Sequence, residues 1–191
     1  MIYEEIKDFY LNYGGKKCVI GYSLGGRALF AMHAGSLSGR QFISVYAVHA
    51  REWITARLAL EHISRGAAEG WGGWIIPLLN PDGALISQTK APLWKANLRG
   101  VDLNCNFDAH WGTGSLNTRT RGAENCIGDF PFSEPESKAL QTFTLKIMPH
   151  VTFAFHTKGE EIYWEFFGGG DEGGANILHA ATGYAVKKVT G

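Results

Sequence analysis

Cysteine is scarce in this sequence, and charge of one sign is absent. Only Cys18, Cys105 and Cys126 occur among the 191 residues. An odd number of cysteines without a repeated spacing does not form a disulfide framework, which indicates a reducing compartment. The 18 Lys and Arg residues equal the 18 Asp and Glu residues, so the formal net charge is zero. Because nucleic-acid-binding proteins carry an excess of positive charge, we expect no nucleic-acid partner.

Long apolar runs are also lacking. No stretch reaches the roughly 18–20 apolar residues that a membrane-spanning helix needs, so we expect no membrane partner. The N-terminal residues Met1–Glu5 do not combine a basic segment with an apolar one. A secretory signal peptide has both segments, so we expect a cytoplasmic protein.

The overall composition is that of an ordinary globular protein. Hydrophobic residues make up 45% of the chain and charged residues 19%, which provides enough apolar material for a large core. A length of 191 residues favours one domain, which we assign to residues 1–191.

The hydrophobic pattern predicts strands that alternate with helices. Apolar residues at helical spacing predict helices, and short apolar runs predict strands. The predicted helices cover residues 2–12, 54–64, 133–148 and 174–187. The predicted strands cover residues 18–20, 28–32, 42–48, 74–79, 151–155 and 162–167, and the first two form a hairpin. This order predicts an α/β fold of three layers, in which a mixed, mostly parallel twisted sheet has helices on both faces.

Several local signals mark the connections. The segment Asn80–Gly83 (Asn-Pro-Asp-Gly) is typical of a turn. Ser133 and Glu136 have the spacing of a capping box, so we expect Ser133 to cap the helix that follows. Residues 84–132 lack periodicity and predict long loops, which in compact domains are often functional. The glycines at 168–170 are expected to end the strand before them.

A metal-binding pattern lies where predicted strands end. His49 and Glu52 follow the strand at 42–48, and on a tight turn an imidazole and a carboxylate at this spacing can converge on one cation. His156 follows the strand at 151–155 and is a candidate third ligand. Ligands of open α/β sheets bind outside the carboxyl ends of the strands. The alternatives are a chance His-x-x-Glu pair and a histidine that is satisfied by ordinary hydrogen bonds.

Four motifs resemble those of the carboxypeptidase A family of metallocarboxypeptidases. His49–Trp53 (His-Ala-Arg-Glu-Trp) is similar to the family's zinc motif, and Phe155-His156 stands where the third zinc ligand is expected. Asn80–Gly83 resembles a turn of the family, and Gly100–Phe107 resembles its Gly-Val-Asp-Leu-Asn-Arg-Asn-Phe segment. The likeness runs from about Ile20 to the end of the sequence, and the shared order of the motifs makes it specific.

The resemblance implies a zinc-dependent peptidase that hydrolyses its substrate with an activated water. His49, Glu52 and His156 would bind one Zn²⁺ ion, because the family's ligand set, as in carboxypeptidase A itself, is two histidines and one glutamate. Asp102 matches a residue that hydrogen-bonds a zinc-bound histidine and so fixes its tautomer.

Two substitutions separate this chain from the family pattern. Lys95 stands where the family has an arginine that polarises the scissile carbonyl, and a lysine supplies positive charge without bidentate geometry. Arg99 is the alternative residue for this role. Arg51 and Asn104 match substrate-binding residues, but Cys105 replaces the arginine that grips the substrate's C-terminal carboxylate. The candidate replacement cations are Arg119, Arg121 and Lys158.

The expected substrate class comes from a further resemblance. Trp94–Asn97 and His156–Glu160 are similar to the γ-D-glutamyl-diamino acid peptidases, a bacterial branch of the family that acts in the turnover of cell-wall peptides. The resemblance therefore implies a peptide or muropeptide as partner. The alternative functions are a catalytically silent module that binds zinc or peptide and a related zinc amidase or deacylase.

One residue of the family pattern is not found. The family's general base is a glutamate on a late strand, and the sequence stops at Gly191 before a matching position. We therefore expect a catalytic domain that is incomplete at its C-terminus, lacks the last strand and helix of the fold, and hydrolyses peptides poorly. The strand at Phe153–Phe155 would have an exposed edge that favours self-association. The alternative bases are Glu160, Glu161 and Glu165.

Overall fold

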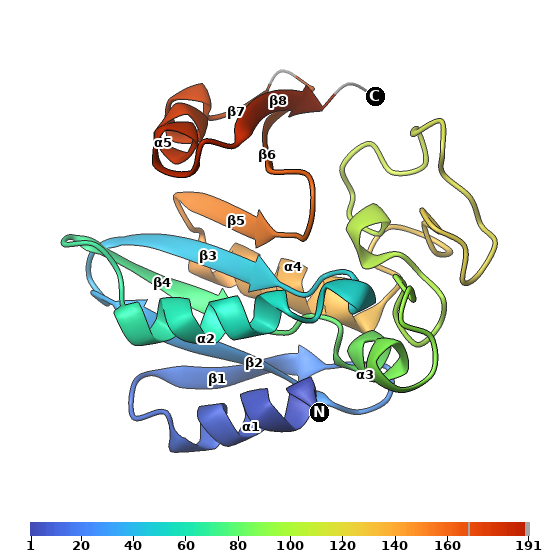
Figure 1. Cartoon of the computed structure of the whole chain (residues 1–191), viewed down its shortest axis with the longest axis horizontal. Helices are drawn as coiled ribbons and strands as arrows, with labels where there is room; N and C mark the ends of the chain where they lie inside the picture. Colours follow the sequence, from blue (N-terminus) through green and yellow to red (C-terminus); the bar gives the residue numbers. More distant parts are fainter. Residues whose placement is uncertain (168, 190–191) are drawn as a thin grey trace. The chain divides into compact units, whose positions relative to one another are not determined.

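The structure, a computed structural model, describes residues 1–167 and 169–189. The chain divides into two compact units, Met1–His156 and Thr157–Gly191. Each unit has its own sheet (Figure 1). The assignment of residues 1–191 to one catalytic domain stays a prediction.

The first unit consists of a five-stranded sheet with four α-helices and two short 3₁₀ turns. Its helices are α1 (Ile2–Asn12), α2 (Thr55–Arg65), α3 (Pro81–Thr89) and α4 (Pro135–Ile147), and its 3₁₀ turns are η1 (Ala50–Glu52) and η2 (Leu103–Cys105). Its strands are β1 (Lys17–Tyr22), β2 (Ala28–Gly35), β3 (Arg40–Tyr46), β4 (Trp71–Ile76) and β5 (Val151–Phe155). The second unit contains β6 (Glu161–Phe166), β7 (Gly169–Gly170), α5 (Glu172–Thr182) and β8 (Ala185–Val189).

The five-stranded sheet is mixed. Its strand order is β1-β2-β4-β3-β5. The β1–β2 and β2–β4 pairs are antiparallel, whereas β3 pairs in parallel with both β4 and β5. The parallel pairs bring the carboxyl ends of β3 and β5 to the same edge of the sheet, as the two arrows in Figure 1 show.

Helices cover both faces of this sheet because its strands alternate apolar side chains between two cores. Ile43, Val45 and Ile76 pack with Leu140 and Phe143 of α4 on one face. On the other face, side chains from β2, β3 and β4 pack against α2; this cluster contains Met32, Ala34, Tyr46, Ala59, Ile63 and Ile75. The α/β fold with a mixed sheet between two helical layers is therefore confirmed.

The segment Asn80–Gly83 is the start of a helix, so the prediction of a turn there was wrong. Helix α3 begins at Pro81, and the Asn80 side chain accepts a hydrogen bond from the Gly83 backbone N–H at 3.0 Å. Asparagine followed by proline suits the N-terminus of a helix as well as a turn, because proline at the first helical position has no N–H to leave unsatisfied.

The predicted cap of α4 was also wrong. The N-cap residue of α4 is Glu134, without a side-chain capping bond. The Ser133 hydroxyl instead donates to Glu134 Oε1 at 2.9 Å and accepts from Asn106 Nδ2 at 2.9 Å. The hydroxyl group of Ser133 thus binds two buried side chains, that of the adjacent Glu134 and that of the distant Asn106, and does not cap the helix.

In the second unit, the last predicted helix is shorter than expected. Helix α5 ends at Thr182 because Gly183 adopts a left-handed conformation with φ 75°, which glycine tolerates without steric cost. Residues 185–187, which we predicted as helical, belong to β8. Of the glycines expected to break the sixth strand, Gly169 and Gly170 pair with it as β7, and Gly168 lies outside the described residues.

Most of the long irregular connections lie between α3 and α4. Between α3 and α4 the chain contains little regular structure apart from η2, as predicted for most of residues 84–132. Residues 84–89, which we predicted to be loop, are helical and belong to α3, so this part of the prediction was wrong. Within the described part of the chain, no helix combines the length and apolar character needed to cross a membrane.

Candidate metal centre

The two predicted histidine ligands follow neighbouring parallel strands. Tyr46 at the end of β3 is paired with Phe155 at the end of β5. His49 lies just after the first strand end and immediately before η1, and His156 directly follows the second. The parallel pairing of β3 with β5 therefore brings together two histidines that are 107 residues apart in the sequence.

Three potential ligand atoms converge at this edge of the sheet. His49 Nδ1 lies 2.9 Å from Glu52 Oε1, and His156 Nδ1 lies 2.9 Å from Glu52 Oε2. The two Nδ1 atoms are 3.2 Å apart, and all of these atoms lie within 4.8 Å of one another. Two imidazole nitrogens and one carboxylate that face a common point fit the ligand set of a catalytic zinc site.

The electrostatic environment keeps Glu52 ionised. Burial raises the pKa of its carboxyl group, but the hydrogen bonds from His156 and His49 outweigh burial and lower the pKa to about 2. A metal ligand must be deprotonated, so this carboxylate is in the form that a cation requires.

The far nitrogen of His49 faces a buried carboxylate. His49 Nε2 lies 3.4 Å from Asp102 Oδ1, which is close enough for charge attraction but long for a hydrogen bond. Among the described residues this nitrogen has no hydrogen-bond partner, although it is fully buried. Burial lowers the pKa of His49, but Asp102 and Glu52 outweigh it and raise the pKa above its ordinary value. The arrangement leaves Nδ1 free to bind a metal and directs Nε2 to Asp102.

Lys95 contacts the same carboxylate. Its Nζ lies 2.7 Å from Asp102 Oδ2, and its side chain is only 14% exposed. Burial raises the pKa of Asp102, but His49 and Lys95 outweigh it and hold the pKa well below its usual range. The ammonium group that we expected to polarise a substrate carbonyl is therefore paired with Asp102, the carboxylate that also faces His49.

The two predicted substrate-binding residues lie on the two 3₁₀ turns. Arg51 is in η1 between His49 and Glu52, and its Nη1 donates to Glu124 Oε1 at 2.7 Å. Asn104 is in η2 with an exposed side chain, and its backbone N–H donates to Asp102 Oδ1 at 3.1 Å. Both turns are thus tied to residues around the metal centre.

Cys105 stays uncharged in this environment. Burial, followed by the negative charge of Asp102, raises the pKa of its thiol to about 12. A neutral thiol cannot replace the guanidinium that would bind a carboxylate.

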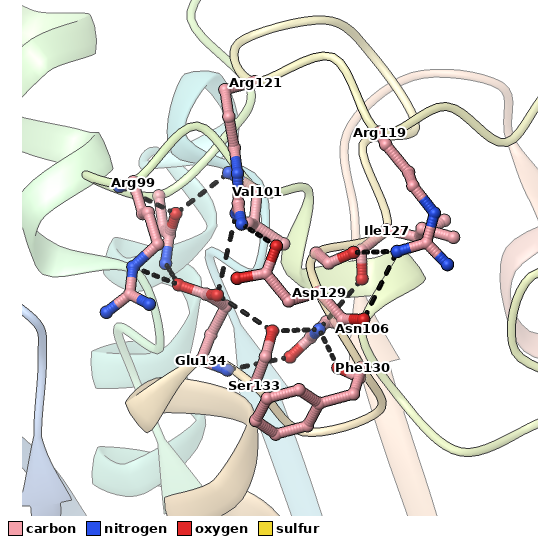
Figure 2. A network of polar contacts seen from close by, with 12 residues as sticks. Arg99, Val101, Asn106, Arg119, Arg121, Ile127, Asp129, Phe130, Ser133 and Glu134 are labelled. Atoms are coloured by element: carbon pink, nitrogen blue, oxygen red, sulfur yellow. Dashed lines mark hydrogen bonds and ion pairs between the residues drawn. The ribbon is translucent and has the colours of Figure 1, made fainter.

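The arginines proposed as replacement cations hold the neighbouring loop together (Figure 2). Arg121 Nη2 lies 2.5 Å from Asp129 Oδ1, and Arg119 Nη1 donates to the backbone carbonyl of Asp129 at 3.3 Å. Arg99, the alternative to Lys95, lies 3.5 Å from the fully buried Glu134. Lys158 belongs to the second unit, and its role stays a prediction.

The alternative general bases also lie in the second unit. Glu161 forms an ion pair with Lys187, and Glu165 lies 3.6 Å from Lys188. Glu160 precedes β6 and is exposed. None of these observations tests a catalytic role, so the position of the base stays a prediction.

Sequence reasoning missed the buried polar residues that support this site. Asn106 is fully buried and donates to the Ile127 carbonyl at 2.9 Å (Figure 2). It also accepts from the Ser137 hydroxyl at 2.6 Å, which ties the end of η2 to α4. Asn97 donates to Glu134 at 2.8 Å and to Glu136 at 3.2 Å. Asn106 lies inside the Gly100–Phe107 motif, so the motif could have identified it as a residue that supports the site.

Two curated relatives align with most of the chain. An uncharacterized protein of Bacillus subtilis, YqgT, is 28% identical over 83% of this chain and 53% of its own length. The γ-D-glutamyl-L-diamino acid endopeptidase 1 of Lysinibacillus sphaericus is 29% identical over 62% of this chain and 39% of its own length. The chain therefore spans about half or less of these relatives.

Solved structures share the fold. Bovine thrombin-activatable fibrinolysis inhibitor superposes with a TM-score of 0.74 at 22% identity, covering 94% of this chain and 66% of its own. The murein-tripeptide amidase MpaA of Escherichia coli O157 superposes with a TM-score of 0.64 at 25% identity, covering 93% of this chain and 74% of its own. The model of the zinc carboxypeptidase family matches residues 71–175, more than half of the sequence. The chain belongs to the zinc carboxypeptidase family.

Proposed function

We propose that this protein is a zinc-dependent hydrolase that cleaves a γ-D-glutamyl-diamino acid amide bond or a related peptide bond. The observation that carries the proposal is the convergence of His49, Glu52 and His156 on one point, with Asp102 behind His49. Family membership implies a peptidase, and the metal and the roles of individual residues are inferred from this geometry.

The proposed role of each residue follows from its contacts. His49, Glu52 and His156 would hold zinc, which supplies Lewis acidity: it lowers the pKa of water to roughly 7 and polarises an amide carbonyl. Asp102 keeps the proton of His49 on Nε2. Lys95, anchored by Asp102, adds positive charge beside the metal ligands. Arg51 and Asn104 contact the substrate.

The substrate class is inferred from Cys105 and from the relatives. A neutral thiol in place of an arginine weakens binding of an ordinary C-terminal carboxylate. One relative carries the name γ-D-glutamyl-L-diamino acid endopeptidase, and one structural neighbour carries the name murein-tripeptide amidase. Both names point to cell-wall peptides, so a muropeptide is the proposed partner.

A second candidate function is a catalytically silent module that binds zinc or peptide. The observation that favours it is that two of the alternative general bases are already ion-paired, Glu161 with Lys187 and Glu165 with Lys188. Without an available base, the protein would bind substrate but turn it over slowly. An amidase or deacylase acting on an N-acyl amino acid is the third candidate.

A panel of three substrates separates these candidates. The zinc-loaded protein is incubated with L-Ala-γ-D-Glu-diaminopimelate, with a blocked dipeptide that ends in phenylalanine, and with an N-acyl amino acid; products are quantified by chromatography. We expect the γ-D-glutamyl peptide to be the preferred substrate, at a low rate. Preference for the blocked dipeptide would contradict the substrate assignment, and binding without any product would favour the silent module.

We also propose that the protein is cytoplasmic and associates with a second copy through β5. Strand β5 is one of the two outer strands of the five-stranded sheet. An edge strand offers unpaired backbone groups to another strand.

A further inference from the structure

A cavity of about 390 Å³ lies in the first unit. Residues 91–95 line it, together with Gly122 and Glu124. Lys95 connects this cavity to the metal centre, because its ammonium group lies 2.7 Å from Asp102, which in turn faces His49. A volume of this size is sufficient for part of a small ligand.

The walls of the cavity combine apolar groups with one carboxylate that is open to solvent. Ala91, Pro92, Leu93 and Trp94 supply apolar surface, and Leu93 is 81% exposed. The positive charge of Lys95 is compensated by Asp102. The side chain of Glu124 is 61% exposed and is therefore the negative group that a ligand in the cavity would meet.

In the part of the chain that the structure describes, an exchangeable ion pair holds Glu124. Its Oε1 lies 2.7 Å from Arg51 Nη1, and the Arg51 side chain is 29% exposed. Ion pairs at solvent-exposed positions contribute little to stability, so a ligand that carries both charges can replace the contact between the two side chains. Arg51 lies between His49 and Glu52, so such a ligand would be held next to the metal ligands.

We propose that this cavity binds the free amino-acid end of a diamino acid. The methylene chain packs on Leu93 and Trp94, the ammonium group donates to Glu124, and the carboxylate on the same carbon accepts from Arg51. The inference rests on the proposed γ-D-glutamyl-diamino acid substrate and adds to it the residue that selects the second amino group. Glu124 is thus a specificity-determining residue.

Equilibrium binding tests this role without any turnover. The probes are mono-N-acetyl-2,6-diaminopimelate and N-acetyl-2-aminopimelate, which differ by one ammonium group and contain no γ-D-glutamyl bond. Calorimetry on the full chain should give about tenfold tighter binding of the probe that carries the ammonium group. Glu124→Gln should abolish this difference between the two probes.

Glu5→Gln is the matched control, because Glu5 forms another exposed ion pair with an arginine, Arg57, at 3.1 Å. This variant should keep the tenfold preference. Equal binding of the two probes by the unmodified chain, no binding of either probe, or a preference that survives in Glu124→Gln would each overturn the inference. If the preference is present but the substrate panel gives no γ-D-glutamyl cleavage, the cavity assignment stands and the proposed reaction fails.

Discussion

At the scale of single residues, the environment of His49 determines which of its nitrogens can bind a metal. Nδ1 faces Glu52 and His156, whereas Nε2 faces the buried Asp102. A proton on Nε2 is attracted by the carboxylate, and Nδ1 then keeps its lone pair for a cation. We therefore expect Asp102 to affect metal binding through His49.

Replacing Asp102 with asparagine should weaken zinc binding by roughly 10–100-fold, because the proton on His49 Nε2 loses its negatively charged partner. Asparagine can still accept the hydrogen bond from the Asn104 backbone N–H, so the local turn should persist. Competition with a chromophoric chelator gives the zinc affinity. Asp129→Asn, on the neighbouring loop, is the control, and unchanged zinc affinity in Asp102→Asn would contradict the role of this residue.

His156→Ala should lose zinc far more completely, because the site then keeps only two protein ligands instead of the three of a catalytic zinc site. Metal content after dialysis, measured by mass spectrometry, checks this expectation. His150→Ala is the control, since His150 is exposed and lies outside the cluster of potential ligands. Equal zinc retention by His156→Ala and the unmodified chain would remove His156 from the site.

At the scale of secondary-structure elements, the N-terminus of α3 fixes the segment that carries the metal ligands. The fully buried Asn80 caps the helix and also donates to the backbone carbonyls of Val48 and Ala96, both at 3.2 Å. Val48 directly precedes His49, and Ala96 directly follows Lys95. One side chain thus connects a helix, a strand end and the loop that lines the cavity.

Asn80→Ala should destabilise the protein by about 2 kcal/mol or more. The change removes a helix cap, which is worth about 0.5–2 kcal/mol, and leaves two buried carbonyl groups without their donor, each at a cost of about 1–3 kcal/mol. Chemical denaturation measures the free energy of unfolding. Asn12→Ala, which removes one exposed local bond to Asp8, should change it by less than about 0.5 kcal/mol. Similar effects of the two changes would show that the capping contacts contribute little.

At the scale of the whole molecule, catalysis depends on which residue acts as the general base. A positioned general base or acid contributes about 10²–10⁴-fold to the rate. We expect a Glu→Gln change at one of the positions 160, 161 and 165 to slow hydrolysis of the γ-D-glutamyl peptide by this factor. Turnover assays on the three variants and the unmodified protein measure the difference. Equal rates in all four proteins would exclude these three residues as the base.

The exposed edge of the five-stranded sheet predicts that two copies of the protein associate. Strand β5 forms one edge of the five-stranded sheet, and Ala154 in its middle is exposed. We expect the apparent molecular mass in light scattering to rise with protein concentration, and Ala154→Lys to reduce this rise, because a lysine on an edge strand opposes pairing with another chain. Thr142→Lys, at an exposed position on α4, is the control. A concentration-independent monomer would contradict self-association.

The sequence by itself determined the layers of the fold and named the three potential ligands. The largely apolar run at 42–48, with Ile43 and Val45 on one face and Tyr46 on the other, requires a core on each face, whatever the connections between the strands. The spacing of His49 and Glu52 and the position of His156 after a strand were visible because each is a local pattern.

Only the tertiary structure decided how the remaining polar groups are used. Asn80 is a helix cap because Val48 and Ala96 lie where its amide can reach them. Without these contacts, the segment Asn80–Gly83 could equally form a turn. Lys95 is paired with Asp102, and Arg51 with Glu124, although nothing in the local sequence selects these partners. Hydrogen bonds and ion pairs between residues distant in sequence depend on distances of a few ångströms, which are set when the chain packs and not by the spacing of its residues.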